Sequence, residues 1–173
     1  FVEDNYTLRE AMRLPIFWVF VIGGMMSPAF LTGIVFHQES LFATAGYDAS
    51  TSAVWVGNGL VLASFSMLIT GFLVDRIRPS FVRALELVVL ASLMVLSTFL
   101  GAGAWALPVW AVLLGVVNGI GGVFNGAVYV NLFGRKHQGE IRGFVSMLGV
   151  TGTAIGPYFL ARSYDAFGNY TAA

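Results

Sequence analysis

Long apolar stretches alternate with short polar segments along the whole chain. Five stretches stand out, at roughly 16–36, 53–74, 82–102, 105–132 and 143–162. A helix of about 20 apolar residues is long enough to cross the hydrocarbon core of a bilayer. Backbone groups in lipid must be hydrogen-bonded within the chain, so we expect each stretch to form one helix. The pattern predicts an all-α membrane protein with five transmembrane helices.

The composition agrees with a chain that is mostly surrounded by lipid. Of the 173 residues, 57% are hydrophobic and only 10% are charged, whereas soluble domains have about 25% charged residues. The net charge is zero and there is no basic tract, which argues against nucleic acid as a partner. The chain has no cysteine for a disulfide or a thiolate metal site. No cluster of acids or histidines lies within a stretch, so we expect no enzyme activity, cofactor or metal.

The basic residues predict how the helices are oriented. Eight of the nine lie before the first stretch, between the second and third, or between the fourth and fifth: Arg9, Arg13, Arg76, Arg78, Arg83, Arg135, Lys136 and Arg142. The alternate connections, 37–52 and 103–104, have none, and Arg162 is the exception. Lys and Arg collect in cytoplasmic loops. We therefore expect the amino end to be cytoplasmic, with all four tryptophans anchored near the membrane–water interfaces.

The sharpest concentration of charge is in "GFLVDRIRPS", at 71–80, directly after the second stretch. Asp75 would face the negative end of a helix dipole, so it needs a cationic or helix-terminal partner. Gly71 to Pro79 reads G-x-L-x-D-R-x-R-P, which resembles the loop motif after the second helix of each half of a major facilitator superfamily transporter. Two more regions, "YTLREAMRLPIFW" (6–18) and 131–170, look like the entry to helix seven and helices ten to eleven of bacterial organic-acid facilitators.

This resemblance implies a fold, a function and a set of partners. The chain would be helices seven to eleven of a six-helix half bundle, without helix twelve and the amino-terminal half. The implied function is secondary active transport of a small organic solute, with a carboxylate as one candidate, by alternating access. The partners would be the lipid bilayer, the solute and the missing half, in a bacterial cytoplasmic membrane. The alternative is a non-transporting membrane scaffold or receptor of the same fold.

The expected organisation has three parts. They are a cytoplasmic entry segment (1–15), a transmembrane bundle (16–164) and an outer loop (165–173). By the resemblance, charged residues on the cytoplasmic side would form a gate, with Asp75 as its anchor and Gly71 as a close-packing site. The basic residues assigned to this gate are Arg76, Arg78, Arg135 and Arg142. The alternative is that these residues only fix the topology and the turn.

Polar residues within the stretches are the candidates for a solute pathway. Asn118, Asn125 and Tyr129 share one helical face, and the alternative is that the two amides only hold helices together. Asn58 and Thr151 are further candidates, although a threonine can bond back to its own helix. The neighbouring glycines form a stripe that favours close helix packing: Gly115, Gly119, Gly122 and Gly126.

Three other residues suggest movement or proton coupling. Pro28 and Pro157 lie inside stretches and predict kinks, either flexible or static. His37 could carry a proton in coupled transport, or could simply cap the first helix. Glu86 follows Arg83 by three residues, a spacing that suggests a structural salt bridge near the cytoplasmic surface. Otherwise we expect no charged side chain in the middle of any helix.

Overall fold

The fold is built from long helices that match the five apolar stretches. The computed structural model describes residues 5–74 and 76–167, and these contain no β-strand. The long helices are α2 (Pro15–Phe36), α4 (Ala49–Val74), α5 (Pro79–Ser97), α6 (Ala106–Phe133) and α7 (Gln138–Phe167). All five are long and apolar enough to cross a membrane. The predicted all-α, membrane-embedded character is therefore confirmed.

Three short elements lie in the connections. They are α1 (Leu8–Ala11), α3 (Gln38–Thr44) and the 3-10 helix η1 (Leu100–Ala102). The third apolar stretch was expected to stay helical to residue 102, but α5 ends at Ser97. The chain then turns through η1 to Gly103, whose φ of +152° lies in a region that favours glycine. The helix therefore ends inside a stretch that hydropathy alone treats as continuous.

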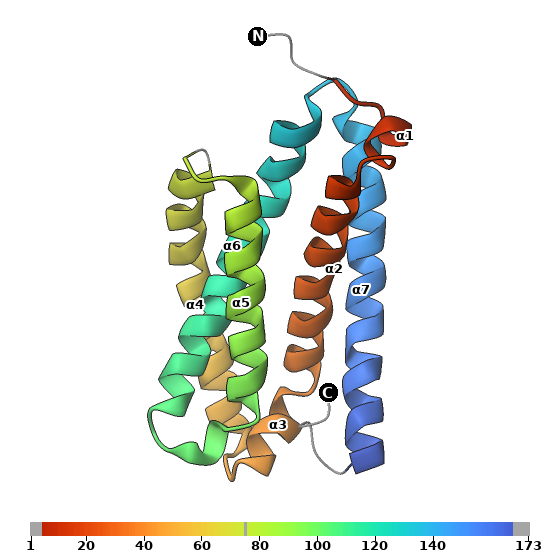
Figure 1. The fold of residues 1–173 in the computed structure, drawn as a ribbon. Coiled ribbons are helices and arrows are strands. Elements are labelled where there is room, and N and C mark those ends of the chain that lie inside the picture. Colours follow the sequence, from red (N-terminus) through yellow and green to blue (C-terminus); the bar gives the residue numbers. More distant parts are fainter. Residues whose placement is uncertain (1–4, 75, 168–173) are drawn as a thin grey trace.

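The connections rich in arginine lie at one end of the molecule. The α4–α5 and α6–α7 connections are at the same end as α1, and α3 and η1 are at the other end (Figure 1). Successive long helices therefore run in alternating directions. Such an arrangement is what the distribution of basic residues predicts.

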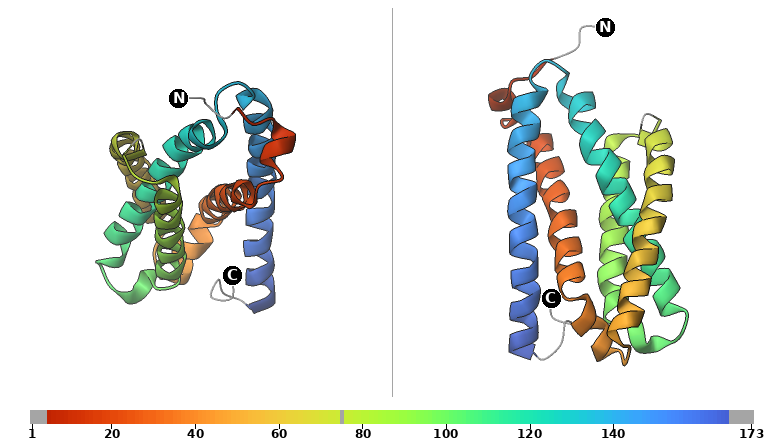
Figure 2. Two further views of the ribbon diagram at one scale, coloured as in Figure 1. Left: turned by 45° about the horizontal axis from the view of Figure 1, so that its top comes forward. Right: turned by 180° about the vertical axis from the view of Figure 1, so that it is seen from behind.

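The long helices form two groups. One contains α4, α5 and α6, and the other pairs α2 with α7 (Figure 2). Within the first group α4 and α6 meet through glycine, because a Cβ added to Gly115 would lie 2.8 Å from the carbonyl oxygen of Gly59. Gly119 faces Ser66 in the same way. The close packing predicted for the glycine stripe is confirmed at Gly115 and Gly119.

The second group is also held by glycines. A Cβ added to Gly152 would lie 2.9 Å from the Met25 carbonyl oxygen, and one added to Gly156 would overlap the Ala29 carbonyl. Pro28 and Pro157 are both inside helices and lie next to this crossing. Each proline removes one helical hydrogen bond where α2 and α7 come closest.

One tryptophan is buried inside the protein. Trp110 is completely buried, and its indole N–H donates to the Ser97 hydroxyl at 2.9 Å. Its ring meets Phe42 edge-on, at 5.2 Å between centroids. The expectation that all four tryptophans anchor the protein in the headgroups is therefore wrong for Trp110. Trp105 is 56% exposed, as an interfacial residue should be.

The chain before α1 is attached to the α6–α7 connection. The Asn5 side-chain oxygen accepts hydrogen bonds from the backbone N–H groups of Arg135 and Lys136, at 3.1 and 3.0 Å. The Tyr6 N–H donates to the Phe133 carbonyl at 3.1 Å. These contacts place the segment before α1 beside the connection that leads into α7, although the two are 130 residues apart in sequence.

Candidate functional site

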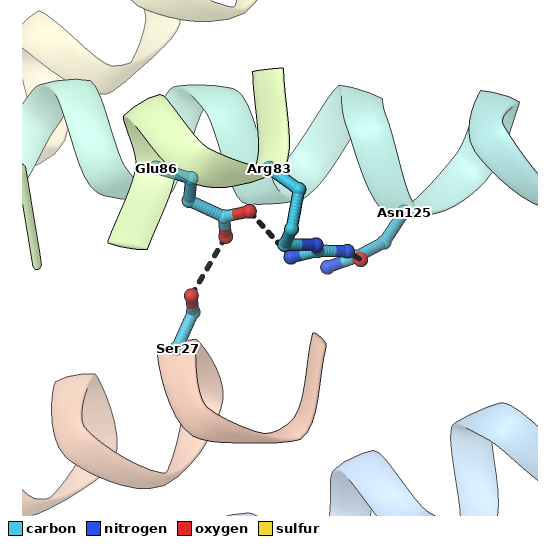
Figure 3. A network of polar contacts seen from close by, with 4 residues as sticks. All are labelled: Ser27, Arg83, Glu86 and Asn125. Carbon is cyan, nitrogen blue, oxygen red and sulfur yellow. Dashed lines mark hydrogen bonds and ion pairs between the residues drawn. The ribbon is translucent and has the colours of Figure 1, made fainter. Parts of the chain in front are cut away.

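A buried ion pair lies where the two helix groups meet. Arg83 and Glu86 of α5 form a salt bridge, and their side chains are only 3% and 0% exposed. Ser27 of α2 donates its hydroxyl to Glu86 at 2.7 Å. Arg83 also donates to the Asn125 side-chain oxygen of α6 at 2.5 Å. This charge network, drawn in Figure 3, therefore joins three helices.

Glycines in α2 make room for the arginine. A Cβ added to Gly23 would lie 2.9 Å from Cδ of Arg83, and one added to Gly24 would lie 3.3 Å from its Nη2. On the other side the guanidinium lies over the ring of Phe124, at 4.7 Å from the centroid. A guanidinium over an aromatic face gains a further electrostatic attraction. The arginine is thus enclosed by groups that suit a cation.

The depth of this pair differs from the expectation. The spacing correctly predicted the salt bridge, but not its position between helices. Ser27 is twelve residues after Pro15 in a helix of 22 residues, so it lies about 18 Å along the helix, near its middle. The Glu86 carboxylate reaches this level. The expectation that no charged side chain lies deep among the helices is therefore wrong.

A polar cleft lies beside the charge network. It has a volume of about 440 Å³ and is bounded by α2, α6 and α7. Glycines form much of its wall, and five side chains give it polar character: Asn125, Tyr129, Arg142, Ser146 and Thr153. Polar groups on membrane-spanning helices usually face the bundle interior or a cavity, and they often mark solute pathways. This cleft is the candidate site.

Two of the predicted pathway residues meet in the cleft. Asn125 lines it while its oxygen is held by Arg83. Tyr129 is only 1% exposed, and its hydroxyl has no hydrogen-bond partner in the described part of the chain. A Cβ added to Gly24 would lie 3.5 Å from this hydroxyl and 3.1 Å from the Asn125 oxygen. The two side chains thus converge opposite α2.

The other predicted pathway residues do not line this cleft. Asn118 is half-buried, and its amide donates to the Leu114 carbonyl of its own helix at 2.9 Å. Asn58 is exposed on α4. Thr151 is exposed on α7 and donates to the Met147 carbonyl at 2.9 Å. A shared helical face was not enough, because Asn118 lies about 10 Å along the helix from Asn125, beyond the part of α6 that lines the cleft.

The predicted gate residues have varied surroundings. Asp75 lies outside the described residues. Arg76 is exposed and donates to the Phe72 carbonyl at 3.1 Å, and Arg78 is exposed before α5. A Cβ added to Gly71 would meet open space, so the close packing expected there is absent among the described residues.

The two arginines of the α6–α7 region differ from one another. Arg135 stays in the connection, where its backbone N–H is bonded to Asn5. Arg142, five residues into α7, instead lines the cleft. Its Nη2 lies 3.4 Å from the position of a Cβ added to Gly126. The structure therefore places one predicted gate residue beside the pathway residues.

His37 connects α2 with α7. Its Nε2 lies 3.1 Å from the Pro157 carbonyl oxygen, and the side chain is half-buried. A neutral imidazole can donate a hydrogen bond there from Nε2. This contact explains a structural role for His37, and its role in proton coupling stays a prediction.

Comparison with known proteins gives no independent assignment. No protein-family model matches this chain, and no curated protein matches it. In the described residues, no group of three His, Cys, Asp or Glu side chains is placed to hold a metal ion. Function must therefore be inferred from the cleft and the charge network themselves.

Proposed function

We propose that this chain belongs to a secondary active transporter of the major facilitator type and moves a small organic solute by alternating access. The polar cleft between α2, α6 and α7 is the observation that carries this proposal. Transporters bind their solutes near the membrane midplane, between helices that move relative to one another. A cleft that reaches Pro28, near the middle of α2, fits this description.

The packing of the helices supports movement. Glycines bring α2 close to α7, and α4 close to α6, whereas fewer backbone positions of α2 approach α5 and α6. Groups whose backbones are closely packed inside, and which meet one another through side chains, can shift as bodies in hinge and shear motions. The loop "GFLVDRIRPS", by its resemblance to the facilitator motif, would close the cytoplasmic side.

Roles follow for the residues in the cleft. Asn125 and Tyr129 contact the solute. Arg142 lies at the side of the cleft nearest the arginine-rich end, where a solute would enter. The amino end of α2 lies in the cytoplasm, because basic loops stay on that side. Asp75, Arg76 and Arg78 belong to the cytoplasmic gate.

Flux through reconstituted vesicles tests the proposal. The full-length protein is inserted into liposomes, and uptake of a panel of labelled anionic, neutral and cationic organic solutes is measured. Asn125→Leu and Tyr129→Phe should each lower uptake about tenfold, the equivalent of one lost hydrogen bond. Asn118→Leu is the matched control, since that amide bonds its own helix, and it should retain uptake.

Two results would count against transport. Absence of flux for every solute, with the protein correctly inserted, would favour the membrane scaffold. Equal losses in the Asn118 and Asn125 variants would show that the cleft has no special role.

A further inference from the structure

A second groove lies between α4 and α5, and we call it the α4–α5 groove. It has a volume of about 320 Å³, and on α6 it is lined by Val112, Val116 and Ile120. It exists because α4 and α5 both pack against α6, while their described backbones approach one another at few positions. Of the described residues that line it, all but Ser66 and Thr70 are hydrophobic. The Ser66 hydroxyl donates to the Val116 carbonyl at 3.4 Å, so the groove offers a largely apolar surface.

The groove extends over about half the thickness of a bilayer core. On α4 it runs from Leu62 to Leu73, eleven residues further along, which corresponds to about 16 Å of helix. The hydrocarbon core of a bilayer is about 30 Å thick, so one leaflet contributes about 15 Å. One end of the groove is at Ile77, in the connection between α4 and α5. An acyl chain that starts at this connection would be covered along the depth of one leaflet.

Two exposed arginines lie at this end of the groove. Arg76 and Arg78 are on either side of Ile77, and neither has an ion-pair partner among the described residues. Together with Asp75 they give the connection a net charge of +1. Arg76 uses one N–H group for the Phe72 carbonyl, whereas a guanidinium has five. The remaining N–H groups suit a phosphate group at the membrane surface.

The lining of the groove favours an acyl chain over another helix. Helices that approach closely in this molecule do so at glycines such as Gly115 and Gly156, as is usual in membranes. The described lining of the α4–α5 groove contains no glycine or alanine. It includes large, partly exposed side chains instead, among them Phe65, Ile69 and Phe81. A flexible chain can fill the space between such side chains, whereas a helix about 10 Å wide could not enter it.

We propose that the α4–α5 groove binds an anionic phospholipid, with one acyl chain in the groove and the phosphate held by Arg76 and Arg78. Basic residues beside pockets between membrane helices are a known means of binding acidic lipid head groups on the cytoplasmic side. The inference goes beyond the proposed function and does not depend on it. Among the described residues, the groove and the polar cleft have no lining residue in common.

Native mass spectrometry of the full-length protein, released from detergent, measures the binding of single lipids. The probes are dioleoyl phosphatidylglycerol, which is anionic, and dioleoyl phosphatidylcholine, which has the same acyl chains and no net charge. Glycerol 3-phosphate is the third probe and has no acyl chain. Phosphatidylglycerol should bind at least about fivefold more tightly than phosphatidylcholine, because a surface arginine contributes about 1 kcal/mol of attraction to an anionic lipid. Glycerol 3-phosphate should not displace either lipid.

Charge variants test the role of the two arginines. Arg76→Gln and Arg78→Gln should each lower the affinity for phosphatidylglycerol about fivefold and leave that for phosphatidylcholine unchanged. Lys136→Gln is the matched control, since Lys136 is an exposed cation of the α6–α7 connection at the same end of the molecule. It should leave both affinities unchanged.

A pair of tryptophan variants tests the groove without changing any charge. Leu68 and Ile69 are neighbours on α4 and are 67% and 60% exposed, but of the two only Ile69 lines the groove. Ile69→Trp should take up space in the groove and lower the affinity for both lipids at least about fivefold. Leu68→Trp adds the same ring outside the groove and should lower neither.

Four results would overturn the lipid site. They are equal affinities for the two lipids, displacement by glycerol 3-phosphate, equal losses in Arg78→Gln and Lys136→Gln, and equal affinities in Ile69→Trp and Leu68→Trp. The first three would reduce the effect to non-selective lipid contact or to a general attraction between phosphate and the basic surface. The last would show that no acyl chain occupies the groove, which would leave it to a helix of a partner protein.

Discussion

At the scale of single residues, the Arg83–Glu86 pair is the most demanding feature of this molecule. Taking two charges out of water costs several kcal/mol per ion, and only good geometry offsets the cost. Here Glu86 is bonded to both Arg83 and Ser27, whereas Nε of Arg83 has no partner among the described residues. The pair therefore specifies how α2, α5 and α6 meet more than it stabilises them.

A double-mutant cycle should reveal this dependence. Glu86→Leu or Arg83→Met alone leaves one buried charge unpaired and should lower the free energy of unfolding by about 3–5 kcal/mol. The double variant Arg83→Met/Glu86→Leu should regain most of that stability. Thermal unfolding in detergent measures the effect, with Glu140→Leu, an exposed acid of α7, as the control. Additive losses in the double variant would show that the two charges do not act as a pair.

The sequence was informative about this pair only in part. Spacing of three along a helix predicted the contact between Arg83 and Glu86. Their burial depends on Ser27, Gly23 and Asn125, which come from two other helices. No local pattern states which helices will be neighbours, so the network could not be predicted.

At the scale of elements, hydropathy located the helices better than their ends. α4 begins at Ala49, whereas the apolar stretch suggested 53. Its first turn is polar, and Asp48 accepts hydrogen bonds from the Thr51 N–H at 2.9 Å and the Ser50 hydroxyl at 2.7 Å. These bonds lower the pKa of Asp48 to about 2. An aspartate in this position caps a helix, and hydropathy alone does not register a cap.

The contact between α2 and α7 gives a prediction at this scale. Gly156→Ala should weaken the packing, because the new Cβ would overlap the Ala29 carbonyl of the facing helix. Overpacking of this kind costs about 1–3 kcal/mol. Gly143→Ala, also on α7, meets no atom within 4 Å and should gain about 1 kcal/mol of helix propensity.

Unfolding midpoints of the two alanine variants provide the measurement. A midpoint below the wild type for Gly156→Ala and at or above it for Gly143→Ala is the expected result. Equal midpoints would mean that α2 and α7 are not in contact at this glycine.

At the scale of the whole molecule, the alternation of the helices was predictable from the arginines. Their grouping was not, because α2 with α7 and α4 with α6 are far apart in sequence. The glycine stripe predicted that another helix packs closely on α6, but not that this helix is α4. The cleft combines residues from three helices, so only Asn125 and Tyr129, which lie on one helix, could be associated beforehand.

The topology itself can be tested by labelling. The chain has no cysteine, so single cysteines give clean signals. Arg78→Cys and Arg135→Cys should react with a membrane-impermeant thiol reagent only from the cytoplasmic side, because basic loops stay there. Ser50→Cys, in the first turn of α4, should react from the opposite side. Labelling of positions 78 and 135 from different sides would contradict an arrangement with five crossings.

The attachment of Asn5 to the α6–α7 connection has a mechanical consequence. Three hydrogen bonds fasten the polypeptide that enters α1 to the turn from which α7, and with it Arg142, departs. A force on the segment before α1 would therefore act directly on the start of α7, at the edge of the cleft, without first passing along α2. Asn5 and Arg142 are thereby coupled through the same α6–α7 connection.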